Sequence, residues 1–442
     1  MMMRGHALAL LVLTAFAWAC DGGPRQQTEH DDADRQRPPR TTVLWISVDG
    51  LRPDYLDRGD TPFLDRLAGS GLYTRQLVPV FPSLTFPSHV SQATGVKPAE
   101  HGIVANAFFD RRSGRRHHYP GDAGLLEAEP IWLTAARQNV RTLVYDWTLS
   151  HSQQGEVTAA YFDNAFDPGL SDADHLERVL ATWRNDEGEA PLRLLMSWIG
   201  DPDRAGHRHG PDSPEVIETV EKTDALLERI HEQALDIYRQ THREGDSFYL
   251  LLTTDHGMST VHTVANLQQL AAIEQRDGVE LITSGNIGHI HFTESRGAEH
   301  ESRIADAARV ADGHDFARAW RREQLPQAWN YAHPKRTGDV VVVLETGFTF
   351  SRRVDNATAP VEQAGGPLGM HGYDPREDPN MNGFGVIWRY PEPLGGREIE
   401  RIHALQLHAT VANILDIAPA EGAHDEAVEL DAATHSVPET VP

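Results

Sequence analysis

Three apolar stretches constrain the fold of this chain, because each leads into acidic or imidazole side chains. They are residues 41–48 followed by Asp49, residues 192–200 followed by Asp203, and residues 247–257, which contain Asp255 and His256. Short, nearly continuous apolar runs with β-branched residues are typical of strands that are buried on both faces, as in a parallel sheet. The sequence therefore predicts at least three buried strands whose ends carry polar side chains.

Helical patterns lie between these strands. Residues 213–240 place apolar side chains at helical spacing with charges on the opposite face, and residues 62–70 form a shorter helix that Gly71 ends. Further strands are expected at 141–147 and 338–347, and a last helix at 405–417. This alternation predicts an α/β fold with a mostly parallel central sheet and helices on both faces. Residues 270–330 show no clear pattern and are assigned to a smaller inserted cap region.

Charge excludes one class of function. The 442 residues include 65 acidic and 40 basic side chains, which give a formal net charge of -25. A basic face for nucleic-acid binding is therefore not expected. An anionic small-molecule substrate is still compatible with this charge, provided that metal ions make the site locally positive.

The N-terminus has the pattern of an export signal. Arg4 precedes an apolar run over residues 7–19, which is too short for a membrane span and is typical of a signal peptide. The run ends at Cys20, the only Cys, in a stretch that resembles a bacterial lipobox. We expect residues 1–20 to be a signal peptide, Cys20 to be lipidated and residues 21–40 to be a flexible tether. The protein would then be a membrane-anchored lipoprotein of the bacterial cell envelope, facing the periplasm; the alternative is a plain secreted protein.

Four short motifs carry candidate metal ligands. They are "SVDG" with Asp49, "DPDRAGHRHGP" with Asp203 and His207, "TTDHGM" with Asp255 and His256, and "GMHGYD" with His371. Each motif alone also fits a turn, a polar loop or a helix cap. Together, three Asp and three His would give two sites of three ligands each, with the open position that a catalytic zinc needs. Two such metals about 4 Å apart can stabilise both oxygens of an in-line displacement at phosphorus.

These motifs occur in an order that resembles the nucleotide pyrophosphatase/phosphodiesterase family of the alkaline phosphatase superfamily. The similarity includes "VPVFPSLTFPSHVSQATGVKPAEHGIVAN" and "EPIWLTA" and extends over residues 41–420. The resemblance implies an alkaline phosphatase-like catalytic domain over residues 41–420, with residues 421–442 as a tail. It also implies a hydrolase of phosphodiester or pyrophosphate bonds whose partner is a small nucleotide-type substrate.

The resemblance also assigns roles to individual residues, with two zinc ions per chain. Asp49, Asp255 and His256 would bind one zinc with Thr85 as a fourth ligand, and Asp203, His207 and His371 would bind the other. Thr85 would be the nucleophile and would form a phosphothreonine intermediate. The chemistry agrees, because a free Thr hydroxyl is a poor nucleophile and zinc coordination lowers its pKa. Pro87 suits the first turn of a helix whose N-terminus would face the phosphoryl group.

Two positions depart from the family pattern. Ser88 stands where the family commonly has an Asn, to which we assign a contact with a phosphoryl oxygen, and its hydroxyl offers one donor on a shorter arm. Trp198 stands where a nucleobase-stacking Tyr is common, so it is expected either to stack on substrate or to pack in the core. Ser88 and Trp198 are therefore both assigned to substrate binding.

Other functions in the same superfamily, and one outside it, were weighed. A sulfatase is excluded, because the only Cys lies in the leader and no Arg follows Thr85 closely. A phosphonate hydrolase and a phosphomonoesterase stay open as alternatives. The alternative of another class is a non-catalytic envelope lipoprotein that binds phosphorylated ligands.

Overall fold

The computed structural model of this chain describes residues 38–273, 278–294 and 297–431. The chain divides into two units, residues 1–39 and 40–442. The expected signal peptide, Cys20 and nearly all of the tether lie outside the described residues. Among the residues that are described, no helix is long and apolar enough to cross a membrane.

A nine-stranded sheet forms the centre of the second unit, in the order β19-β2-β18-β8-β1-β7-β5-β6 with β20 beside β2. Its pairings are parallel except for β18, which is antiparallel to both β2 and β8. The expected α/β fold with a mostly parallel sheet is confirmed. The strands are β1 (Thr41–Val48), β2 (Leu72–Val78), β5 (Arg141–Val144), β6 (Tyr161–Phe162), β7 (Leu192–Ile199), β8 (Ser247–Thr253), β18 (Gly383–Tyr390), β19 (Arg397–Glu398) and β20 (Ile402–His403).

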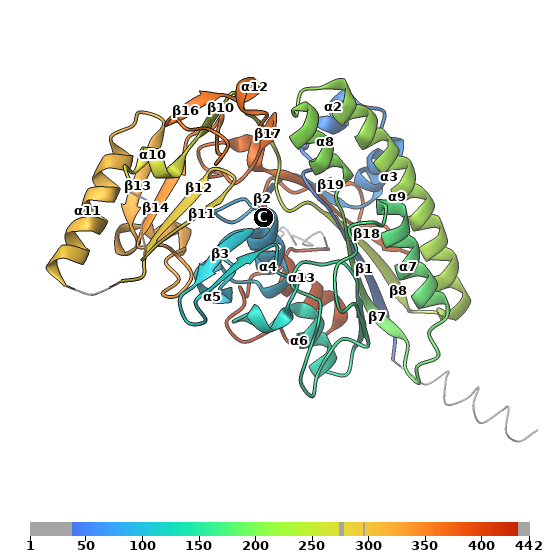
Figure 1. Cartoon of the computed structure of the whole chain (residues 1–442). Coiled ribbons are helices and arrows are strands. Elements are labelled where there is room, and N and C mark those ends of the chain that lie inside the picture. Colours follow the sequence, from blue (N-terminus) through green and yellow to red (C-terminus); the bar gives the residue numbers. More distant parts are fainter. Residues whose placement is uncertain (1–37, 274–277, 295–296, 432–442) are drawn as a thin grey trace, which may run out of the picture. The chain divides into compact units, whose positions relative to one another are not determined.

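Helices cover both faces of this sheet, as Figure 1 shows. Side chains alternate along a strand, so Leu44 and Ile46 of β1 enter one core and Val43 and Trp45 enter the other. The first core is closed by α3 (Pro62–Ser70), α7 (Asp172–Arg184) and α9 (Pro214–Thr241). The second core is closed by α4 (Thr85–Thr94), α6 (Ile131–Arg137) and α13 (Gln406–Leu415).

The inserted cap is a second, smaller layer. Four antiparallel strands in the order β11-β12-β14-β13 pack against α11 and form a separate hydrophobic core. The strand expected at 338–347 exists, but as β14 it belongs to this cap and not to the central sheet. The cap elements are β11 (Val279–Ser284), β12 (Ile287–Phe292), α11 (Ala298–Asp312), β13 (Ala317–Arg321) and β14 (Val340–Leu344).

The remaining helices and strands are short or lie outside these two layers. They are α2 (Tyr55–Arg58), α5 (Pro98–His101), β3 (Ala107–Asp110), β4 (Arg115–His118), α8 (Asp201–His209), β9 (Ser259–Thr260), β10 (Thr263–Ala265), α10 (Leu267–Leu270), β15 (Phe348–Phe350), β16 (Thr358–Pro360), α12 (Val361–Ala364) and β17 (Gly369–Met370). Of these, α8 and the segment after β17 carry candidate metal ligands.

Packing continues beyond the domain boundary expected at residue 420. Val428 is buried in the same core as α13, and its backbone N–H donates to Thr410 Oγ1 at 2.9 Å. The backbone N–H of His424 donates to the carbonyl of Gly95 at the end of α4. The first part of the predicted tail is therefore packed onto the catalytic domain.

Candidate metal centre

The candidate ligands converge because β8, β1 and β7 are adjacent and parallel, so their carboxyl ends lie at one edge of the sheet. Asp49 directly follows β1, Asp255 follows β8, and α8 with Asp203 follows β7. Gly50 allows these loops to approach closely. Its φ is +69°, and a Cβ at this position would lie 3.0 Å from the Cα of Asp203.

One cluster consists of Asp49, Asp255 and His256, all three of which are buried. The Nε2 of His256 lies 3.3 Å from Asp49 Oδ1 and 3.0 Å from Asp255 Oδ2. Thr85 Oγ1 lies 3.3 Å from the same Nε2. The structure therefore brings together the four residues that the sequence assigned to one metal.

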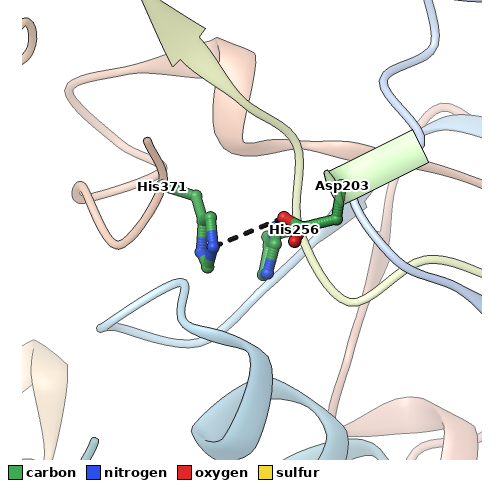
Figure 2. A group of neighbouring side chains, drawn as sticks. All are labelled: Asp203, His256 and His371. Carbon is green, nitrogen blue, oxygen red and sulfur yellow. Dashed lines mark ion pairs between the residues drawn. The ribbon is translucent and has the colours of Figure 1, made fainter. Parts of the chain in front are cut away.

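A second cluster consists of Asp203, His207 and His371. The Oδ1 of Asp203 lies 3.3 Å from His207 Nε2 and 3.5 Å from His371 Nε2, and the two Nε2 atoms lie 3.2 Å apart. Figure 2 shows how Asp203, His256 and His371 converge, with the imidazoles of His256 and His371 stacked at 3.5 Å between ring centroids. The two clusters are thus adjacent, and the second is the more exposed of the two.

The three imidazoles are held in one orientation by backbone carbonyl groups. Their Nδ1 atoms lie 2.7–2.9 Å from carbonyl oxygens: His207 from Gly369, His256 from Gly257, and His371 from Ser83. A carbonyl can only accept, so each Nδ1 carries a proton, and in the neutral imidazole the lone pair is then on Nε2, which points to the centre. This arrangement is typical of the outer contacts that orient metal-binding His residues.

The residues fit a pair of divalent cations. Among the described residues, one oxygen each of Asp49, Asp203 and Asp255 is buried without a hydrogen-bond partner. These oxygens face unprotonated imidazole nitrogens at 3.0–3.5 Å, which is repulsive unless a cation lies between them. Ligand atoms about 3.3 Å apart also match a tetrahedron with bonds of about 2.0–2.1 Å, as for zinc.

The pKa values of residues in the two clusters also indicate a cation site. Burial and then the neighbouring Asp255 and Asp203 raise the pKa of Asp49 well above its ordinary value. Burial, followed by Asp203, raises the pKa of Asp255 in the same direction. Burial and then His256 and His207 lower the pKa of His371. Carboxylates that repel one another and neutral imidazoles together form a site that a cation would stabilise.

Thr85 is the first residue of α4, so its hydroxyl lies at the helix tip beside the clusters. His89, one turn later, supports it. The Nδ1 of His89 donates to the Thr85 carbonyl at 2.9 Å and lies 3.3 Å from Asp255 Oδ2, while its Nε2 accepts from Ser47 Oγ at 2.8 Å. Burial lowers the pKa of His89 to about 3, so this imidazole is neutral. The sequence analysis did not assign His89 a role.

The structure does not support the assignment of Ser88 to substrate binding. Ser88 is completely buried, its Oγ has no partner among the described residues, and it does not line the cavity beside the metal centre. Asn106 occupies that place instead. It lines the cavity with Thr85, and its Oδ1 accepts the backbone N–H of Phe86 at 2.9 Å. This bond and Pro87, which lacks an N–H, also reduce the number of free donors at the helix start.

Trp198 contacts both the cavity and a candidate metal ligand. It lines the cavity, and its Nε1 donates to Asp49 Oδ2 at 2.9 Å. Its ring also contacts Phe166 edge to face, with ring centroids 5.7 Å apart. Trp198 therefore joins the metal centre to the cavity wall.

The cavity itself has a volume of about 300 Å³ and opens beside the clusters. Aromatic side chains form much of its wall, namely Phe86, Tyr119, Phe166 and Trp198. Its lining also includes Asp146, Thr148 and His151, which are buried and each have at least one polar atom without a hydrogen-bond partner. Such a cavity can hold an aromatic group that carries hydrogen-bonding atoms at its edge.

The comparisons with known proteins decide the family. The sequence model described as type I phosphodiesterase / nucleotide pyrophosphatase matches residues 43–374, which is most of the chain. The chain belongs to this family. It is therefore a hydrolase of the nucleotide pyrophosphatase/phosphodiesterase type, as the sequence motifs predicted.

Relatives agree over nearly the full length. An uncharacterised pyrophosphatase/phosphodiesterase of Schizosaccharomyces pombe is 27% identical over 409 residues, which cover 88% of this chain and 80% of the relative. Human ectonucleotide pyrophosphatase/phosphodiesterase family member 7 is 26% identical over 436 residues, or 94% of this chain and 87% of the relative. A bis(5'-adenosyl)-triphosphatase of Bos taurus is 26% identical over 391 residues, or 86% and 79%.

Solved structures confirm the fold. Murine ectonucleotide pyrophosphatase/phosphodiesterase 5 has a TM-score of 0.73 at 23% identity, covering 86% of this chain and 96% of that one. An inactive variant of the same murine protein, in which a Thr is replaced by Ala, was solved in complex with AMP. It has a TM-score of 0.72 at 22% identity, with the same coverage of both chains.

Proposed function

We propose that this protein is a two-zinc phosphodiesterase that hydrolyses phosphodiester or pyrophosphate bonds of nucleotide-type substrates. The observation that carries the proposal is the convergence of six side chains around Thr85. They form two adjacent clusters, with Asp49, Asp255, His256 and Thr85 as ligands of one ion and Asp203, His207 and His371 as ligands of the other. Zinc, when bound, would lower the pKa of the Thr85 hydroxyl and balance the charge that develops on the phosphoryl oxygens.

The chain's own residues then perform two displacement steps. Thr85 Oγ1 attacks phosphorus, the bond to the leaving oxygen breaks, and a phosphothreonine forms. Water then attacks the same phosphorus, which releases a phosphomonoester and restores the Thr85 hydroxyl. His89 fixes the turn that carries Thr85, and Asn106 keeps side-chain N–H donors beside it, since its Oδ1 is occupied by Phe86.

The cavity supports a nucleotide as the substrate. Phe86 and Phe166 offer apolar faces for a base, and the unpartnered atoms of Asp146, Thr148 and His151 offer hydrogen bonds to its edge. The AMP complex of the murine relative and the name of the bovine relative are consistent with this choice.

The proposal extends to localisation. Cys20 at the end of the apolar run is proposed to carry lipid, which would anchor the enzyme to a membrane of the bacterial cell envelope with the catalytic domain in the periplasm. Replacement of Cys20 by Ala in the full-length chain should move the protein from the membrane fraction to the soluble fraction. Unchanged membrane association would contradict lipidation.

The test of catalysis compares the zinc-loaded wild type with Thr85→Ala. Release of p-nitrophenol from the p-nitrophenyl ester of thymidine 5'-monophosphate should fall by at least about 10³-fold in the variant, because the nucleophile is lost. Equal rates would refute the role of Thr85. Parallel assays with p-nitrophenyl phosphate and with phosphonoacetate test the two alternatives within the superfamily. Faster hydrolysis of p-nitrophenyl phosphate than of the diester would favour a monoesterase, and faster hydrolysis of phosphonoacetate would favour a phosphonate hydrolase.

A further inference from the structure

The helix α8 carries two residues of the second metal cluster, Asp203 and His207, but it does not cap its own N-terminus. Its N-cap residue is Gly200, which has no side chain to accept a hydrogen bond, and Pro202 lies in its first turn. Helices usually begin at a residue whose side chain accepts from the first free N–H groups. Support for this end of α8 therefore has to come from elsewhere in the fold.

Asp172, at the start of α7, supplies this support and is only 2% exposed. Its Oδ2 accepts the backbone N–H groups of Gly200 at 3.1 Å and of Asp201 at 2.8 Å. Its Oδ1 accepts from Arg204 Nη2 at 2.6 Å. Because these donors lie on both sides of Asp203 in the sequence, one carboxylate holds the turn of backbone that carries this candidate ligand.

The carboxylate of Asp172 is not needed to cap its own helix. α7 has a capping box, in which the Ser171 side chain accepts the backbone N–H of Asp174 and the Asp174 side chain accepts that of Ser171. A buried carboxylate is costly unless it is paired and hydrogen-bonded. Here the pairing partner is Arg204, whose guanidinium also bonds Asp201. Every contact that compensates the burial of Asp172 thus comes from α8 and the residue before it.

We propose that Asp172, together with Arg204, is a positioning residue that raises the affinity of the second zinc site by fixing α8. This inference rests on the proposed two-zinc centre. To share an ion, Asp203 Oδ1 has to stay beside the imidazole nitrogens of His207 and His371. Outer contacts that orient metal ligands change metal affinity by about 10- to 100-fold. Arg204 also lines the cavity, so the alternative is that it contacts the substrate directly.

Asp172→Asn tests the proposal, because it keeps the size of the side chain and removes the carboxylate. Competition of the zinc-loaded protein with a chromogenic chelator should show about 10-fold weaker binding of one zinc, while the other keeps its wild-type affinity. A His371→Ala variant lacks one ligand of the second cluster and so identifies the zinc that belongs there. Wild-type affinity at the second site, or an equal loss at both sites, overturns the proposal.

The matched control is Asp186→Asn, just beyond the other end of α7. The Asp186 side chain is also buried and accepts hydrogen bonds from Arg141, Tyr161 and the backbone of Gly188, none of which is a candidate metal ligand. This variant should have a lower Tm but bind both zinc ions as wild type does. If Asp172 were only a structural residue, Asp172→Asn would give the same result as this control.

Arg204→Gln separates positioning from substrate contact, and it also serves if Asp172→Asn does not fold. Weaker zinc binding at the second site, with little change in KM for the p-nitrophenyl ester of thymidine 5'-monophosphate at saturating zinc, supports the proposal. A higher KM with wild-type zinc affinity assigns Arg204 to the substrate and overturns it. Failure of the proposed function gives a different result, because wild type and Thr85→Ala would then hydrolyse the ester equally, whereas the zinc titrations do not depend on turnover.

Discussion

Replacement of Trp198 by Phe removes one hydrogen-bond donor from the metal centre and keeps an aromatic ring in the cavity. The indole N–H donates to Asp49 Oδ2 at 2.9 Å, and Asp49 is only 2% exposed. Water therefore has little access to replace the lost donor. The Asp49 carboxylate would be held less firmly, and we expect weaker zinc binding rather than only weaker substrate binding.

The size of the effect follows from the type of bond. A hydrogen bond to a charged group contributes about 1.5–3 kcal/mol, and 1.4 kcal/mol corresponds to a tenfold change in affinity. The expected loss in zinc affinity is thus about 10- to 100-fold, in the range that is usual for outer contacts of metal ligands. The loss should concern the ion that Asp49 binds, and the ion at Asp203, His207 and His371 should be retained.

Zinc affinity can be measured by competition with a chromogenic chelator, in wild type and in Trp198→Phe. Trp388→Phe is the matched control, because that indole also donates to a side-chain oxygen, Ser70 Oγ at 3.1 Å, but lies outside the centre. If Trp198→Phe binds both zinc ions as wild type does and only KM for nucleotide esters rises, Trp198 is merely a stacking surface. That result would refute the reasoning from the Asp49 contact.

Two further predictions concern stability and the corrected substrate contact. Asp49→Asn should abolish binding of one zinc and, in the zinc-free protein, should raise Tm at pH 8. The pKa of Asp49 is raised in the folded protein, so ionisation of this carboxyl destabilises the fold as pH rises above the ordinary pKa of 3.8. Asn does not ionise and avoids this loss. An equal or lower zinc-free Tm at pH 8, measured by calorimetry, contradicts this. Asn106→Ala should lower kcat about 100-fold. Ser88→Asn should lower the free energy of unfolding by about 1–3 kcal/mol through overpacking and leave kcat nearly unchanged. A large change of kcat in Ser88→Asn and none in Asn106→Ala, with stability followed by denaturant unfolding, would return Ser88 to the site.

The sequence indicated the candidate metal ligands because several of their positions depend on local features. β1, β7 and β8 are recognisable as buried runs, and the carboxyl ends of neighbouring parallel strands must lie at one edge of the sheet. Asp49, Asp203 and Asp255 follow three such runs, whereas the pairing of Asp49 with Asp255 at one ion came from the family resemblance. His371 enters from a segment beyond the cap, and here only the family motif, and not periodicity, indicated its place.

The cap and the strand order were not predictable in the same way. β14 reads as a buried strand whether it lies in the central sheet or in the cap, because an apolar run indicates burial and not its partner. The end of the domain was misplaced for a related reason. Residues 421–431 have no regular secondary structure, yet Val428 is buried by contacts with the distant α13 core, which no local pattern indicates.

The exchange of Ser88 for Asn106 shows where sequence proximity fails as a guide to a site. Ser88 is three residues from Thr85, but α4 is buried from Pro87 onward, so only the helix tip reaches the cavity. Asn106 comes 21 residues after Thr85, in the loop between α5 and β3. It reaches the helix tip through its hydrogen bond to the Phe86 N–H. The donors around the phosphoryl group are therefore supplied by loops that pack against the helix start.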